Sequence, residues 1–206
     1  MNPARTAIFI EPQGALLEAL RERKAWLEQT MPRQAFTRHP PHVTLLFGDY
    51  GPPDQWLSAL RTRVARQPAF TLMSDCWREF PNDLQAAGGH TVAYQIQVSS
   101  ALLALQLAVA ETLAVYRVPS PTPHPLADRE PFATSLRLFG FPFVGPHWIP
   151  HFTVGSPRVS PLDPLLRNLM AASPLHASLV QSVTLWRVRA DEHERLSELA
   201  LAPAAS

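Results

Sequence analysis

The sequence contains one short pattern twice, PHVTL at residues 41–45 and PHFTV at residues 150–154. The same offset, without a gap, also aligns four pairs of residues downstream: Pro52 with Pro161, Asp54 with Asp163, Leu57 with Leu166, and Leu60 with Leu169. Seven of about twenty aligned positions are then identical, whereas about one or two are expected between unrelated stretches. This internal repeat predicts a chain of two similar halves, at about residues 1–78 and 90–190.

Both halves are predicted to contain the same order of elements: a strand, a helix, the His-x-Thr strand, a second helix and a further strand. Apolar periodicity and helix-capping residues indicate the positions. In the first half the predicted elements are a strand at 7–10, a helix at 15–29, a strand at 43–47, a helix with Asp54 as its N-cap, and a strand at 70–77. In the second half they are a strand at 91–98, a helix at 101–116 capped by Ser99 and Ser100, a strand at 152–154, a helix at 163–172 and a strand at 177–188.

The second half is longer because a proline-rich insertion occupies about residues 117–150. Each proline removes a backbone donor and fixes one dihedral angle, and no long periodic run survives in this segment. We predict an extended loop with a strand near residues 135–139. The insertion is interpreted either as a rigid surface excursion or, since long ordered loops are often functional, as a segment that borders a ligand groove.

Composition narrows the class of protein. The 206 residues are 46% hydrophobic and 17% charged, so residues 1–206 are expected to form one domain with a substantial core. The sequence has 18 Lys and Arg residues and 17 Asp and Glu residues, so its net charge is near zero. A protein that binds nucleic acid mainly through the phosphates has a large basic excess, and this class is therefore excluded. The single Cys76 excludes an intrachain disulfide and favours a cytoplasmic location. The most apolar stretch, residues 101–115, is too short to span a bilayer, and no membrane association is expected.

The His-x-Thr spacing indicates which side chains act together. In a strand, residues i and i+2 project from the same face, so His42 shares a face with Thr44, and His151 with Thr153. If the two strands lie beside a pseudo-twofold axis, the two motifs face each other across a groove. Two imidazoles and two hydroxyls suit proton transfer at an anion, because one neutral histidine can act as base while a protonated one acts as acid.

These two motifs and the order of elements resemble the 2H phosphoesterases, and within them the bacterial and archaeal RNA 2′,3′-cyclic phosphodiesterases, historically called 2′-5′ RNA ligases (LigT-like). The resemblance implies an α+β, bilobal fold in which two pseudo-twofold-related antiparallel β-sheets carry helices on their outer faces and enclose a central groove. It also implies hydrolysis of a 2′,3′-cyclic phosphate to a 2′-phosphomonoester, on RNA ends or on small nucleotides, without a metal ion or other cofactor. The reverse reaction would join RNA ends through a 2′-5′ linkage.

The resemblance also implies a role for each motif residue. His151 is expected to activate water as the base, and His42 to protonate the departing O3′ as the acid. Thr44 and Thr153 are expected to hold the phosphate. The two histidine roles can be exchanged, and the reverse reaction exchanges them.

Residues outside the motifs are open to two interpretations. Arg38, before the first motif, and Arg158, after the second, are either substrate contacts or solvated loop charges. Phe47 and Trp148 are expected to pack in the core, with base stacking as the alternative. The remaining histidines without a pattern are predicted to lie on the surface: His90, His124, His176 and His193.

Two other functions remain as alternatives. The close pairs His39/His42 and His147/His151 suggest a metallohydrolase, but intervening prolines prevent helical presentation and no carboxylate accompanies either pair, so no metal is expected. A non-catalytic module that binds RNA or nucleotides would keep the groove and lack turnover. The sequence does not define the oligomeric state, and a monomer is compatible with it.

Overall fold

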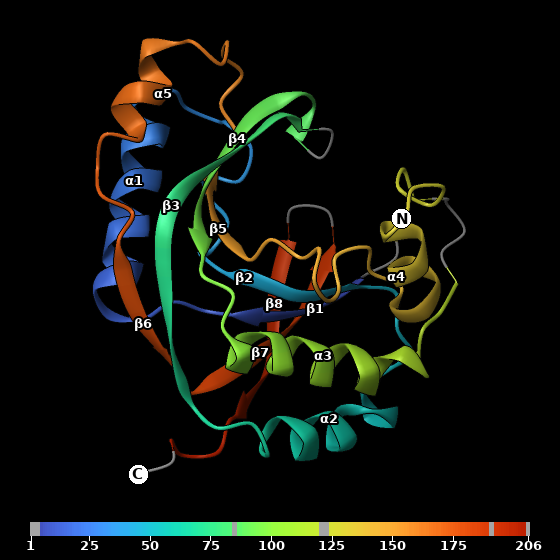
Figure 1. Cartoon of the computed structure of the whole chain (residues 1–206). Coiled ribbons are helices and arrows are strands. Elements are labelled where there is room, and N and C mark those ends of the chain that lie inside the picture. Colours follow the sequence, from blue (N-terminus) through green and yellow to red (C-terminus); the bar gives the residue numbers. More distant parts are fainter. Residues whose placement is uncertain (1–4, 84–85, 120–123, 190–191, 205–206) are drawn as a thin grey trace.

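The computed structural model describes residues 5–83, 86–119, 124–189 and 192–204. These residues form two four-stranded antiparallel β-sheets with helices packed on them (Figure 1). The first sheet has the order β2-β1-β7-β8, with bounds β1 (Arg5–Ile10), β2 (Val43–Gly48), β7 (Ser182–Arg189) and β8 (Glu192–Ala200). The second has the order β5-β4-β3-β6, with bounds β3 (Phe70–Asp83), β4 (Gly89–Ile96), β5 (His151–Gly155) and β6 (His176–Val180). The predicted α+β fold is confirmed.

Each sheet combines strands from both halves of the sequence. Strand β3 follows the first repeat but pairs with β4, and β7 follows the second repeat but pairs with β1. The two His-x-Thr strands, β2 and β5, are edge strands of different sheets and contact each other at the centre of the molecule. The exchange of β3 and β7 therefore ties the sheets together around the pair of motifs.

The helices follow the same exchange. Their bounds are α1 (Gly14–Thr30), α2 (Leu57–Val64), α3 (Ser100–Ala114), α4 (Phe132–Phe139) and α5 (Pro164–Leu169), with a 3-10 helix η1 at Pro53–Gln55. Helix α1, from the first half, packs on β5 and β6 of the second sheet. Helix α3, from the second half, packs on β2 of the first sheet. None of the helices among the described residues is long and apolar enough to cross a membrane.

Most predicted elements are confirmed within a few residues, and Ser99 caps α3 by accepting a hydrogen bond from the backbone N–H of Leu102. The predicted capping role of Asp54 is wrong, because this residue lies within η1. The N-cap of α2 is Trp56, which makes no side-chain cap. Trp56 is instead buried, and its Nε1 donates to the carbonyl oxygen of Gly51 at 2.6 Å.

The C-terminal part of the chain also departs from the prediction. The single strand expected at 177–188 is two strands, β6 and β7, separated by Gln181 and belonging to different sheets. Strand β8 is not predicted by the sequence pattern. It is an edge strand with mostly polar residues on both faces, and such a strand lacks the apolar alternation that reveals one buried face.

The strand expected at 135–139 is wrong, since these residues belong to helix α4. Phe132, Leu136 and Phe139 recur at helical spacing, and Gly140 ends the helix in a left-handed conformation with φ of 73°. The helix is short enough to fit between prolines. Residues 120–123 of the proline-rich insertion lie outside the described residues.

Removal of the Ser99 hydroxyl tests the cap of α3. We expect Ser99→Ala to lower the free energy of unfolding by about 1 kcal/mol, because the Leu102 N–H loses its acceptor. Urea unfolding of the two proteins measures the difference. Ser100→Ala is the matched control: it removes a neighbouring exposed hydroxyl, and an equal loss in this variant would contradict the cap.

Candidate functional site

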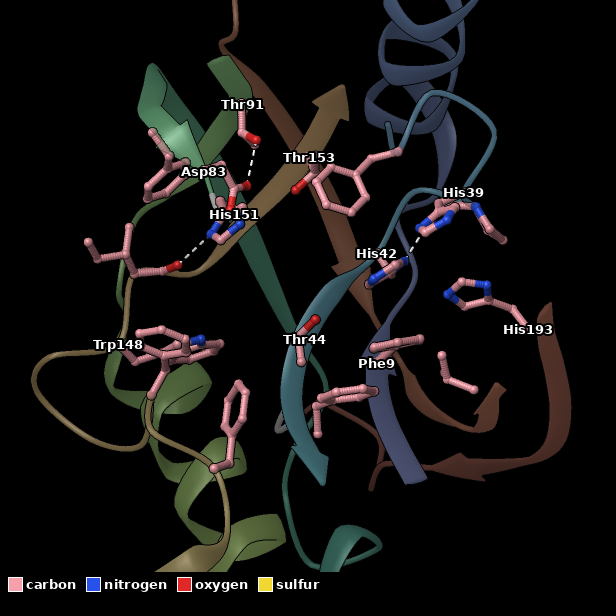
Figure 2. Close-up of a pocket in the computed structure, with 18 of the residues that line it drawn as sticks. Phe9, His39, His42, Thr44, Asp83, Thr91, Trp148, His151, Thr153 and His193 are labelled. Carbon is pink, nitrogen blue, oxygen red and sulfur yellow. Dashed lines mark hydrogen bonds between the residues drawn. The ribbon is translucent and has the colours of Figure 1, made fainter. Parts of the chain in front are cut away.

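The two His-x-Thr motifs line a single cavity of about 560 Å³ (Figure 2). The alternating residues Val43 and Leu45 in β2 are buried in the core, as are Phe152 and Val154 in β5. Burial of one face of each strand turns the other face, with its histidine and threonine, toward the cavity. The structure therefore brings together the four motif residues that the sequence singled out: His42, Thr44, His151 and Thr153.

Both imidazoles are held by the same local hydrogen bond. The Nδ1 of His42 lies 2.7 Å from the carbonyl oxygen of Pro40, and the Nδ1 of His151 lies 2.7 Å from that of Ile149. A carbonyl oxygen only accepts, so Nδ1 is the nitrogen that carries the proton in each ring. In the neutral state, Nε2 of each histidine is thus the atom able to accept a proton.

The ring of each histidine also contacts the ring of a phenylalanine on another strand of the same sheet. The ring of Phe9, in β1, stacks on His42 with a centroid distance of 3.8 Å. The ring of Phe80, in β3, lies 4.9 Å from that of His151. These contacts restrict both rings to one orientation, and the repeat alone does not identify either phenylalanine.

The charged surroundings of the two histidines differ. Burial lowers the pKa of His42 to about 3, and positive charge on His193, Lys24 and His39 acts in the same direction. Burial also lowers the pKa of His151, but the carboxylate of Asp83 acts to raise it, and Arg78 opposes that effect more weakly. Both imidazoles are therefore neutral at pH 7 in the free protein, and the negative charge lies on the His151 side of the cavity.

The proline-rich insertion forms one wall of the cavity. Its lining residues are Phe132, Phe141, Phe143, His147, Trp148 and Ile149. Trp148 and Phe47 both line the cavity, and Trp148 is also largely buried, at 6% exposure. The structure thus supports the interpretation of the insertion as the border of a groove.

The predicted arginine contacts are not part of this cavity. Arg38 is exposed, and its Nη2 lies 2.6 Å from Oε1 of Glu28. Arg158 is also exposed, and its backbone N–H donates to Oε1 of Gln34 at 3.0 Å. Neither side chain lines the cavity as the structure describes it.

Two histidines expected on the surface are placed elsewhere. His193, in β8, lines the cavity, and its ring lies 4.5 Å from that of His39 in an edge-to-face arrangement. His90 is buried and contacts Glu79 through Nε2. His176 and His124 are half-buried. Within the described ranges, no group of three or more His, Cys, Asp or Glu side chains is arranged to hold a metal ion.

Comparison with known families decides where the chain belongs. The family model described as the 2′-5′ RNA ligase superfamily matches residues 10–192. The chain belongs to this superfamily. Membership confirms the resemblance to the 2H phosphoesterases that the two motifs indicated, and it places the chain among phosphoesterases and ligases.

Two solved structures share the fold of this chain. Escherichia coli LigT in its apo form is 19% identical, with a TM-score of 0.57 over 98% of this chain and 99% of that chain. The protein TT0787 of Thermus thermophilus is 18% identical, with a TM-score of 0.62 over 97% and 98% of the two chains. No curated protein matches the chain in sequence.

The lowered pKa of His42 and the hydrogen bond at its Nδ1 predict an unusual titration. We expect the His42 imidazole to stay neutral, with its proton on Nδ1, from pH 8 down to about pH 4, because its pKa is about 3. Side-chain 15N NMR distinguishes the two tautomers from the protonated ring. The urea-unfolded protein is the control, in which histidines titrate near pH 6.5. A folded-state His42 that protonates near pH 6.5 would contradict this description.

Proposed function

We propose that the protein hydrolyses 2′,3′-cyclic phosphates to 2′-phosphomonoesters, with His42 and His151 as a metal-independent acid and base pair. The observation that carries the proposal is the placement of both His-x-Thr motifs around one cavity, with each Nδ1 bonded to a carbonyl oxygen. Membership of the 2′-5′ RNA ligase superfamily supports the same class of chemistry.

The proposed reaction is a displacement at phosphorus. One neutral histidine accepts a proton from water through Nε2 as the water oxygen bonds to phosphorus. The bond between phosphorus and O3′ breaks, and the other histidine, protonated, donates its proton to O3′. The hydroxyls of Thr44 and Thr153 donate to the phosphoryl oxygens, whose negative charge increases in the transition state. With a ribose 5′-hydroxyl in place of water, the same displacement gives a 2′-5′ linkage.

The charges around the cavity favour one assignment of the two histidine roles. A bound phosphate raises the pKa of both imidazoles, and the proton is held best where a carboxylate is near. Asp83 acts to raise the pKa of His151, and Arg78 acts more weakly to lower it. All three charged neighbours of His42, namely His193, Lys24 and His39, act to lower its pKa. We therefore assign His42 as the base and His151 as the acid in hydrolysis, which is the reverse of the order implied by the resemblance.

The lining of the cavity supports a substrate of nucleotide size. Among the described residues, seven phenylalanines and one tryptophan line it: Phe9, Phe36, Phe47, Phe80, Phe132, Phe141, Phe143 and Trp148. A purine or pyrimidine can stack on such rings. No arginine occurs among the described lining residues, so the cavity offers few contacts for the phosphates of a longer RNA. Solved structures of Escherichia coli LigT with 3′-AMP and with phosphate are consistent with a nucleotide at this site.

Substitution of each histidine tests the acid and base pair. We expect His42→Ala and His151→Ala each to lower kcat by about 10²- to 10⁴-fold, because each removes one proton transfer. The double variant should be little slower than either single variant, because the two groups act as a unit. The assay uses an oligonucleotide with a 2′,3′-cyclic phosphate end in EDTA and identifies a 2′-phosphate product.

His176→Ala is the matched control, because this ring stacks on Tyr94 at 6.0 Å and does not line the cavity. It should retain the activity of the unmodified protein. Near-normal turnover in either cavity variant would overturn the two-histidine mechanism. Tight nucleotide binding by the unmodified protein without any hydrolysis would indicate a binding module instead.

The size of the substrate is tested by comparing a 2′,3′-cyclic mononucleotide with an oligonucleotide that has the same end. We expect kcat/KM values within about tenfold of each other, and less than about a threefold change for the oligonucleotide between 50 and 200 mM salt, because few chain phosphates are contacted. Steady-state kinetics at the two salt concentrations measure both quantities. A hundredfold loss of kcat/KM at the higher salt would indicate several phosphate contacts and contradict the nucleotide-sized site.

A further inference from the structure

Lys24 is the single lysine of the sequence, and it is buried in the molecule at 6% exposure. It lies in α1 on the same face as Leu20 and Leu27, where an apolar residue is expected from the helical spacing. Its side chain also lines the cavity that holds the two His-x-Thr motifs. Lysine is rarely found on the buried face of a helix. Its position beside the cavity therefore suggests a functional role.

The ammonium group lies between the segments that carry the two motifs. Its Nζ donates to the carbonyl oxygen of Phe36 at 2.6 Å, in the loop that leads to β2. It also donates to the carbonyl oxygen of Val154 at 3.2 Å, which follows Thr153 in β5. An ammonium has three N–H donors, and these two bonds use two of them. The described residues provide no third acceptor, so one donor is left for a ligand in the cavity.

No carboxylate neutralises this charge within the described residues. None of the ion pairs found there includes Lys24. Glu28, one turn further along α1, is engaged by Arg38 and by the hydroxyl of Thr37. Burial of a cation without an anion costs free energy, and an anion that enters the cavity would offset this cost.

We propose that Lys24 is the cation that binds the phosphate oxygens of the substrate in this cavity. The proposal rests on the proposed function in identifying the anion as a cyclic phosphate. The net charge of the chain is only +1, so an anionic ligand has to be bound by a local positive charge. Lys24, in α1, supplies this charge. Lys24 thus provides the basic substrate contact that the sequence suggested for Arg38 or Arg158.

The state of the amine supports this role. Burial lowers the pKa of Lys24 to about 7, and an anion beside Nζ would raise it again. Anion binding is then strongest below about pH 7, where the amine is charged, and weakens as the pH rises toward the pKa of the complex. Other ionisable side chains line the cavity, namely His39, His42, Asp83, His147, His151 and His193. Those on α1 are Glu18, Arg21, Glu22, Arg23 and Glu28, and those on the elements packed on α1 include His176 and Arg167.

Sulfate is a suitable probe because it keeps its double charge over the whole pH range of interest. We expect calorimetric titration of the full chain with sulfate to give a Kd that is lowest below about pH 7 and that rises about tenfold for each pH unit above it, up to the pKa of the complex. Lys24→Met should weaken binding at pH 7 by about tenfold or more and remove the pH dependence above pH 7. Any contribution of the cavity histidines remains in this variant and is subtracted.

Arg21→Met is the matched control, because it removes one positive charge from the exposed face of the same helix. It should leave both the sulfate affinity and its pH dependence unchanged. Equal sulfate affinity and equal pH dependence in the Lys24→Met protein would overturn the proposal.

A second experiment needs no variant. Pyridoxal 5′-phosphate condenses with a neutral amine, with loss of water, to an imine that borohydride reduces to a stable secondary amine. We expect labelling at the peptide containing Lys24 near pH 7.5, with several-fold protection by sulfate. Labelling that sulfate does not reduce would contradict an anion site at Nζ. Both experiments measure binding without turnover. If the protein is active but fails both tests, only the role of Lys24 is refuted. If it passes both tests but is inactive, only the proposed reaction is refuted.

Discussion

The burial of alternate residues in two edge strands is the constraint on which the rest of the structure depends. Val43 and Leu45 in β2, and Phe152 and Val154 in β5, have almost no exposed surface. A shift of either strand by one residue would expose these side chains and bury a histidine and a threonine in their place. The free energy of core burial, about 1.5–3 kcal/mol for each large apolar side chain, therefore holds the site residues in position.

The exchange of elements between the two halves turns this local constraint into one site. If each sheet contained strands from one half only, the two motifs would belong to independent units. Strands β3 and β7 cross to the other sheet, and helices α1 and α3 pack on the sheet of the other half. Lys24 illustrates the consequence, because a helix of the first half contacts the backbone of the second motif through its Nζ. The geometry of the cavity thus depends on the whole chain.

The repeat predicted the parts of the fold that repeat. The motif strands and the first two helices follow from spacing and alternation that the two halves share. The cap at Ser99 follows from a serine directly before an apolar helical run. Helix α4 was missed because it has no counterpart in the first half and lies among prolines. The crossing between β6 and β7 was missed because the spacing of Leu179, Val183 and Leu185 resembles a single strand, although Leu179 is exposed and the chain changes sheets after Val180. At the site, Lys24 was missed because helical periodicity identifies buried positions by their apolar residues.

A crystal structure of the protein with 2′-AMP, a product of the proposed hydrolysis, would show whether the two motifs bind the same phosphate. We expect one phosphate between the two motifs, with its oxygens within about 3 Å of Nε2 of both His42 and His151. The adenine would stack on aromatic rings of the cavity. A phosphate that contacts only one of the two histidines, or that binds outside the cavity, would contradict the claim that both act on the same phosphorus.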